Sequence, residues 1–108
     1  NNVHLCKQRF LAVEPAIPLL VRVGLTGSNW ARFAAVEVLT DILWWLSDVY
    51  SAPWRPALGV VLDRFLIGGG LDVVALADDA TLPGFVRHAA VELGEALAAA
   101  QAAARAPS

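Results

Sequence analysis

The stretch Asn29-Trp-Ala-Arg-Phe-Ala-Ala-Val-Glu-Val-Leu-Thr-Asp-Ile-Leu-Trp-Trp-Leu-Ser-Asp-Val-Tyr50 is the longest part of the chain with a helical period and without glycine or proline. At 100° per residue, its apolar side chains gather on one broad side of a helix. They are Ala34, Ala35, Val38, Leu39, Ile42, Leu43, Trp45, Leu46, Val49 and Tyr50. A face roughly 200° wide has to be buried, so the pattern predicts a helix deep in a bundle. Ser28 or Asn29 is expected to cap its start.

The opposite side of this helix carries carboxylates together with aromatic rings. Five residues spaced four, four, three and four positions apart share this face, and we call them the aromatic–acidic stripe: Phe33, Glu37, Asp41, Trp44 and Asp48. Glu37 and Asp41 repel each other by a few tenths of a kcal/mol unless a cation lies beside them. Either the face is solvated and Trp44 lies flat over its neighbours, or the stripe binds a basic partner. Because Trp is enriched at binding hot spots, we predict partner binding by these five residues.

A second long helix is predicted from Pro83 to Arg105, with Thr81 as its cap. Its apolar positions recur at helical spacing: Val86, Ala90, Leu93, Leu97 and Ala100. The second half is nearly all alanine, which favours helix and lets a neighbouring helix approach closely, although a frayed end is equally compatible. The predicted fold is therefore all-α. It is one small, Ala-rich helical domain over residues 1–108, with long helices at about 29–50 and 83–105, shorter helices, and frayed ends at 1–3 and 104–108.

The segments between these helices are harder to assign. Pro15 and Pro18 are expected to end regular helix, because proline lacks an N–H and restricts the residue before it. The apolar run Leu19–Leu25 is too short to assign from its period. Val73–Leu76 has the composition of a strand, but no second strand-like run is available to pair with it.

The composition indicates a chain that has much of its surface in contact with protein partners or lipid. Hydrophobic residues make up 57% of the 108 residues, and charged residues make up only 17%, whereas about 25% charged is usual. The net charge of −2 gives no electrostatic footprint for nucleic acid. The chain contains no Met, so we expect a mature or partial chain from which any targeting segment has been removed. Its localisation is not determined, and an organelle or a membrane surface is compatible.

A membrane-spanning helix is not expected. In the central helix, about eight strongly apolar residues gain ~0.3–0.6 kcal/mol each on insertion, and one central Asp costs ~2.5–3.5 kcal/mol. Residues Pro56–Ala77 are a better candidate, but three charged residues there would need partners inside the bilayer: Asp63, Arg64 and Asp72.

The residues that could carry chemistry are few and badly spaced. The soft metal ligands do not have the spacing of a zinc site, and they are His4, Cys6 and His88. The glycine triplet at 68–70 is followed by Leu71 and Asp72 instead of the lysine of a phosphate loop. Asp78 and Asp79 lie in a turn, where Asp is favoured for local hydrogen bonds. The sequence therefore predicts no catalytic residue, no metal and no cofactor, and the chain is not expected to be an enzyme.

Two functions remain. The favoured one is a structural or accessory subunit, or an interaction module, that contacts other protein subunits of a larger assembly, with membrane or lipid contact as an additional expectation. The alternative is a small helical carrier whose Trp-rich interior holds an apolar ligand or pigment, with Trp30, Trp45 and Trp54 as its aromatic walls.

Overall fold

The computed structural model describes residues 14–47, 63 and 72–105. This part of the chain is all-α and contains no strand, which confirms the predicted fold class. Its elements are a short 3-10 helix η1 (Glu14–Ala16) and four α-helices: α2 (Ile17–Thr26), α3 (Asn29–Ser47), α5 (Val73–Asp78) and α6 (Gly84–Arg105). Helices α3 and α6 correspond to the two predicted long helices, and residues 48–50 of the first prediction lie outside the described residues.

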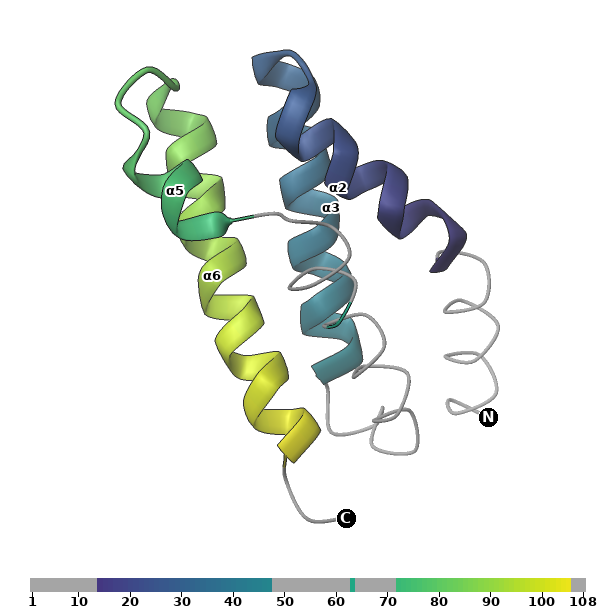
Figure 1. The fold of residues 1–108 in the computed structure, drawn as a ribbon. Coiled ribbons are helices and arrows are strands. Elements are labelled where there is room, and N and C mark those ends of the chain that lie inside the picture. Colours follow the sequence, from purple (N-terminus) through teal and green to yellow (C-terminus); the bar gives the residue numbers. More distant parts are fainter. Residues whose placement is uncertain (1–13, 48–62, 64–71, 106–108) are drawn as a thin grey trace.

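The described helices form two hairpins packed side by side. Gly27 and Ser28 join α2 to α3, residues 79–83 join α5 to α6, and both turns lie at the same end of the bundle (Figure 1). Within each hairpin the two helices are antiparallel. Because both turns lie at the same end, the second helices of the two hairpins, α3 and α6, run parallel to each other. The contact between α3 and α6 is the most extensive of the bundle, with α2 against α3 and α5 against α6 on its two sides.

The turn between α2 and α3 depends on one glycine and one serine. The backbone N–H of Gly27 donates to the Val23 carbonyl at 2.8 Å, and a Cβ at Gly27 would lie only 2.6 Å from that oxygen. Glycine is needed here for close approach. The Ser28 hydroxyl accepts a hydrogen bond from the N–H of Ala31 at 3.4 Å, which confirms Ser28 as the cap of α3.

One expectation about the short segments is wrong, and the expectation that Val73–Leu76 forms no sheet is confirmed in the described part of the chain. Pro18 does not end helical structure; it lies in the first turn of α2, where backbone N–H groups have no acceptor in the helix, so its missing donor costs little. Val73–Leu76 is not a strand but part of α5. The Asp72 carboxylate accepts a hydrogen bond from the N–H of Ala75 at 3.0 Å and caps that helix.

The cap predicted for α6 is also wrong. The helix begins at Gly84, and the Thr81 hydroxyl donates to Oδ1 of Asp79 at 2.5 Å instead of serving the helix. The Pro83 carbonyl accepts the N–H groups of Val86 and Arg87, each at 3.1 Å. Thr81 therefore stabilises the turn before α6, and the first turn of α6 is held by backbone hydrogen bonds to Pro83.

The core lies between α2, α3 and α6. The largest fully buried side chains are Ile17, Val36, Leu39, Leu43, Val86 and Leu93. All five predicted apolar positions of α6 are buried, which confirms that stripe. Ala96 and Ala100 are 0% exposed, so the alanines allow α6 to pack closely. Ala104, where we expected fraying to begin, is still helical and packs against the core, and residues 106–108 lie outside the described part.

The buried face of α3 is rotated from the predicted one by roughly 60° on a helix of 100° per residue. Val36 and Thr40 are buried, whereas Ala34 and Val38, expected inside, are exposed, Val38 to 44%. Thr40 can be buried because its hydroxyl donates to the Val36 carbonyl at 2.9 Å. This rotation decides which side chains of α3 reach the surface.

No helix within the described ranges is long and apolar enough to span a bilayer. The better candidate segment, Pro56–Ala77, lies mostly outside the described residues.

Candidate interaction surface on helix α3

The rotation of α3 separates one member of the aromatic–acidic stripe from the others. Asp41 is exposed, Trp44 is 48% exposed and Glu37 is half-buried. Phe33 turns toward α6 and packs against the core, and Asp48 lies outside the described residues. The structure therefore brings Glu37, Asp41 and Trp44 together on the outer side of α3 and moves Phe33 to the edge of the buried face.

Trp30 takes the place of Phe33 on this surface. Its side chain is 72% exposed. On α3 it lies seven residues before Glu37 and fourteen before Trp44. Seven residues are almost two helical turns, so these three side chains drift by only about 20° at each step. Sequence reasoning assigned Trp30 to the interior, but this seven-residue spacing was the signal that places it on the stripe.

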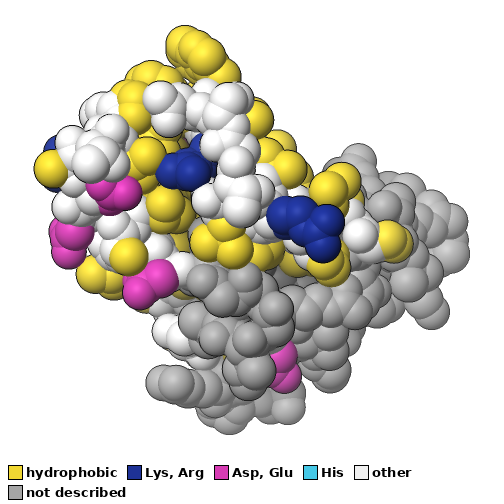
Figure 2. Space-filling model, turned by 45° about the horizontal axis from the view of Figure 1, so that its top comes forward, with side chains coloured by type: hydrophobic (Ala, Val, Ile, Leu, Met, Phe, Trp, Pro, Cys, Tyr) yellow, Lys and Arg dark blue, Asp and Glu magenta, His cyan; other side chains and the backbone are white. Residues whose placement is uncertain are grey.

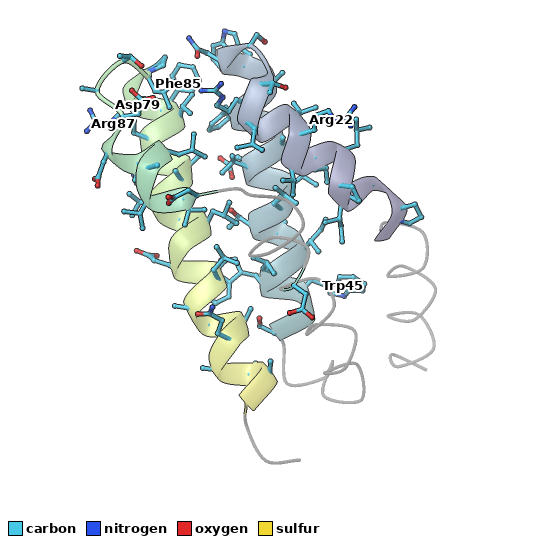
Figure 3. All side chains as sticks on the ribbon, viewed as in Figure 1. Arg22, Trp45, Asp79, Phe85 and Arg87 are labelled. Atoms are coloured by element: carbon cyan, nitrogen blue, oxygen red, sulfur yellow. The ribbon has the colours of Figure 1, made fainter. Side chains whose placement is uncertain are left out.

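The Trp30 ring is held in place by aromatic contacts from two helices. It stacks on Phe85 of α6 with ring centroids 4.7 Å apart and planes inclined by 25°. Phe33 meets Trp30 edge-on at 6.2 Å and Phe85 edge-on at 5.4 Å. Figure 3 places Phe85 at the start of α6, facing the first turns of α3. Such pairs contribute ~0.5–1.5 kcal/mol each beyond burial, so the exposed indole is ordered before any partner arrives.

Among the described residues, no Lys or Arg lies beside the carboxylates of this surface. In the described part of the chain, no Lys or Arg nitrogen lies within 4 Å of Glu37 or Asp41. The close carboxylate contact found there joins His88 Nε2 to Glu92 on α6 at 3.2 Å, and it is an ion pair only when His88 is protonated. The repulsion between Glu37 and Asp41 is therefore unrelieved within the described residues. A cation brought by a partner would relieve it.

The arginines at the hairpin end of the molecule are engaged elsewhere. Arg32 donates from Nη2 to the Leu25 carbonyl, and Arg87 donates from Nε to the Ala77 carbonyl, each at 3.0 Å. The Nε of Arg32 is the buried side-chain polar atom without a hydrogen bond among the described residues. In Figure 2, the Lys and Arg groups of this end lie among hydrophobic side chains. Each arginine ties the two helices of its own hairpin together, and neither neutralises the stripe.

Asp79 has a local structural role in the turn, whereas Asp78, which was also expected in the turn, is the last residue of α5. Oδ1 of Asp79 accepts the hydroxyl of Thr81 at 2.5 Å and its backbone N–H at 2.9 Å. These two hydrogen bonds lower the pKa of Asp79, and the charges of Arg32 and Arg87 lower it further. A carboxylate held ionised by its own turn is poorly suited to donate a proton near neutral pH.

The described residues hold no cluster of metal ligands, and they separate the Trp residues expected to line an interior. This part of the chain contains no group of three or more His, Cys, Asp or Glu side chains that could hold a metal ion, and His4 and Cys6 lie outside it. Of the three Trp residues expected to line an interior, Trp30 is exposed, Trp45 is half-buried against the core, and Trp54 is outside the described residues. Trp30 therefore cannot serve as an interior wall.

Comparisons of the chain with protein-family models, with curated proteins and with solved structures find no match. The outer face of α3 is the feature of the described residues that points to a function.

Proposed function

We propose that this chain is an interaction module, a structural or accessory subunit of a larger protein assembly, with no catalytic role of its own. The observation that supports this most directly is the 72% exposure of Trp30, a large ring held open to solvent by its stack on Phe85. Single exposed apolar side chains are normal, but Trp44 is also exposed on the same side of α3. Two exposed indoles on one helix face, one of them held by ring contacts, are typical of a contact surface.

The energetic argument favours burial of both rings in a complex. Covering an aromatic side chain removes on the order of 150–250 Å² of surface from water, at ~25 cal/mol per Å² of apolar area. Trp30 and Trp44 are already positioned on a rigid helix, so little side-chain entropy is lost when a partner covers them.

The test is the size of the native particle that contains the chain. Tagged wild-type protein is isolated from its natural source without denaturant and sized by chromatography with mass detection. We expect it in a particle much larger than the 11.5 kDa chain. Trp30→Ala and Trp44→Ala should each release it.

Val91→Ala is the matched control. Val91 is 48% exposed, like Trp44, but it lies on α6. A wild-type chain that elutes alone contradicts the proposal, and so does release by Val91→Ala that equals release by the two Trp variants.

A further inference from the structure

We infer that the partner at this surface is a basic amphipathic helix whose Lys or Arg side chains lie between two apolar anchors, one on Trp30 and one on Trp44. The inference rests on the proposed function and specifies the chemistry of the partner.

The spacing along α3 sets the length of the partner. Trp30, Glu37 and Trp44 lie at intervals of seven residues, which is about 10.5 Å of helix axis each. The two indoles are therefore about 21 Å apart along α3, with Glu37 and Asp41 between them. A helix of about 14 residues spans that distance and repeats its own face every seven residues.

A partner in strand conformation fits this face less well. The backbone groups of α3 are hydrogen-bonded within the helix, so an extended segment would gain no main-chain hydrogen bonds from it. Recognition has to come from side chains at helical spacing, which is how amphipathic helices bind.

The charges distinguish a basic partner from two other occupants. A second copy of the chain, docked through the same face, would bring its own Glu37 and Asp41 against these carboxylates. An anionic lipid surface would be repelled in the same way. Lys or Arg side chains pair with both carboxylates, which have no cation within 4 Å among the described residues, and they are also attracted to exposed indole faces. The surface therefore fits a cationic protein segment.

The test is a selection from displayed helical peptides against the purified full-length chain. The library holds helices of about 18 residues, ~27 Å long. Leu positions are fixed at both ends of one face, and the positions between them are randomised among Lys, Glu and Gln. We expect the selected peptides to be rich in Lys, and their affinity to fall at least about tenfold, or 1.4 kcal/mol, with Trp30→Ala or Trp44→Ala. The Glu37→Lys/Asp41→Lys variant should select Glu-rich peptides instead.

The inference is overturned if the selected peptides show no charge preference, or if the charge-reversed variant still selects Lys-rich peptides. It is also overturned if Trp30→Ala and Trp44→Ala leave peptide binding intact. Stripe-dependent binding to vesicles of equal parts phosphatidylcholine and phosphatidylserine also overturns it. The proposed function can survive each of these results, because the native particle can still depend on Trp30 and Trp44. If the native particle does not depend on them, the proposed function itself fails.

Discussion

Trp44 and Trp45 are neighbours in the chain but have different environments. Trp44 is 48% exposed on the outer side of α3, whereas Trp45 is half-buried and packs against the core from the other side of the helix, where Figure 3 labels it. Replacing each of these two residues therefore distinguishes a loss of partner binding from a loss of fold stability.

We expect Trp45→Ala to lower the free energy of unfolding by ~2–3 kcal/mol, somewhat less than the ~3–5 kcal/mol of a fully buried Trp. Trp44→Ala should lower it by less than ~1 kcal/mol, because half of its side chain is already in water. Urea unfolding of both variants followed by circular dichroism measures the difference. Equal losses would mean that Trp44 belongs to the core and that the surface has been misidentified.

The carboxylate of Asp79 gives a prediction about pH. Because the Thr81 hydrogen bonds lower its pKa, the ionised form stabilises the folded state. That contribution is complete above the unfolded pKa, about 3.9, and is lost as the pH falls through the lower folded pKa. Thr81→Val removes the hydroxyl, so the pKa of Asp79 should rise toward its ordinary value.

Carbon NMR of the carboxyl group during an acid titration measures this change. Thr26→Val is the control, because the Thr26 hydroxyl donates to the Arg22 carbonyl at the end of α2 and does not touch Asp79. An unchanged pKa of Asp79 in Thr81→Val would contradict the assigned cause.

At the scale of the helix, the sequence predicted where the long helices lie in the chain better than it predicted which face of α3 is buried. The 3.6-residue period located α3 and α6 to within a few residues, because long apolar stripes are hard to produce otherwise. The buried face of α3 could not be predicted, since apolar residues surround most of that helix and only the neighbouring helices select a side. The sequence does not reveal α2, because proline usually ends a helix, whereas the first positions of a helix tolerate it.

The small size of the buried alanines of α6 predicts that a larger side chain there would destabilise the packing of α3 against α6. Ala96 is 0% exposed and buried in the core, whereas Ala98, two residues later, is exposed. Ala96→Leu adds volume where there is no room and should lower the free energy of unfolding by ~1–3 kcal/mol. Ala98→Leu has a similar helix propensity and should change it by less than ~0.5 kcal/mol. Thermal melts of the two variants decide; a neutral Ala96→Leu would mean that the two helices are not in close contact.

At the scale of the whole molecule, the parallel arrangement of α3 and α6 could not be read from the chain. It places Phe85 beside Trp30 and so creates the ordered, exposed indole. Glu37, Asp41 and Trp44 were found from the sequence because their spacing alone puts them on one helix face. Trp30 could have been added from its seven-residue spacing to Glu37, but the loss of Phe33 to the buried side needed tertiary contacts, since it follows from how far α3 is turned against α6.

The charged and the aromatic residues of the surface are expected to act on different rate constants of partner binding. Charges that are exposed act mainly on the encounter of two proteins, while buried aromatic anchors act mainly on dissociation. With the strongest Lys-rich peptide from the selection as the ligand, Asp41→Asn should slow association by about two- to tenfold and flatten its dependence on salt.

Trp44→Ala should instead leave the association rate nearly unchanged and raise the dissociation rate about tenfold or more. Stopped-flow fluorescence of a dye-labelled peptide, from low to high ionic strength, measures both constants. The Glu95→Gln variant is the control for charge, because Glu95 is an exposed carboxylate on α6, outside the stripe. If Glu95→Gln slows association as much as Asp41→Asn does, the net charge of the chain steers the partner and the position of Asp41 on α3 carries no specificity.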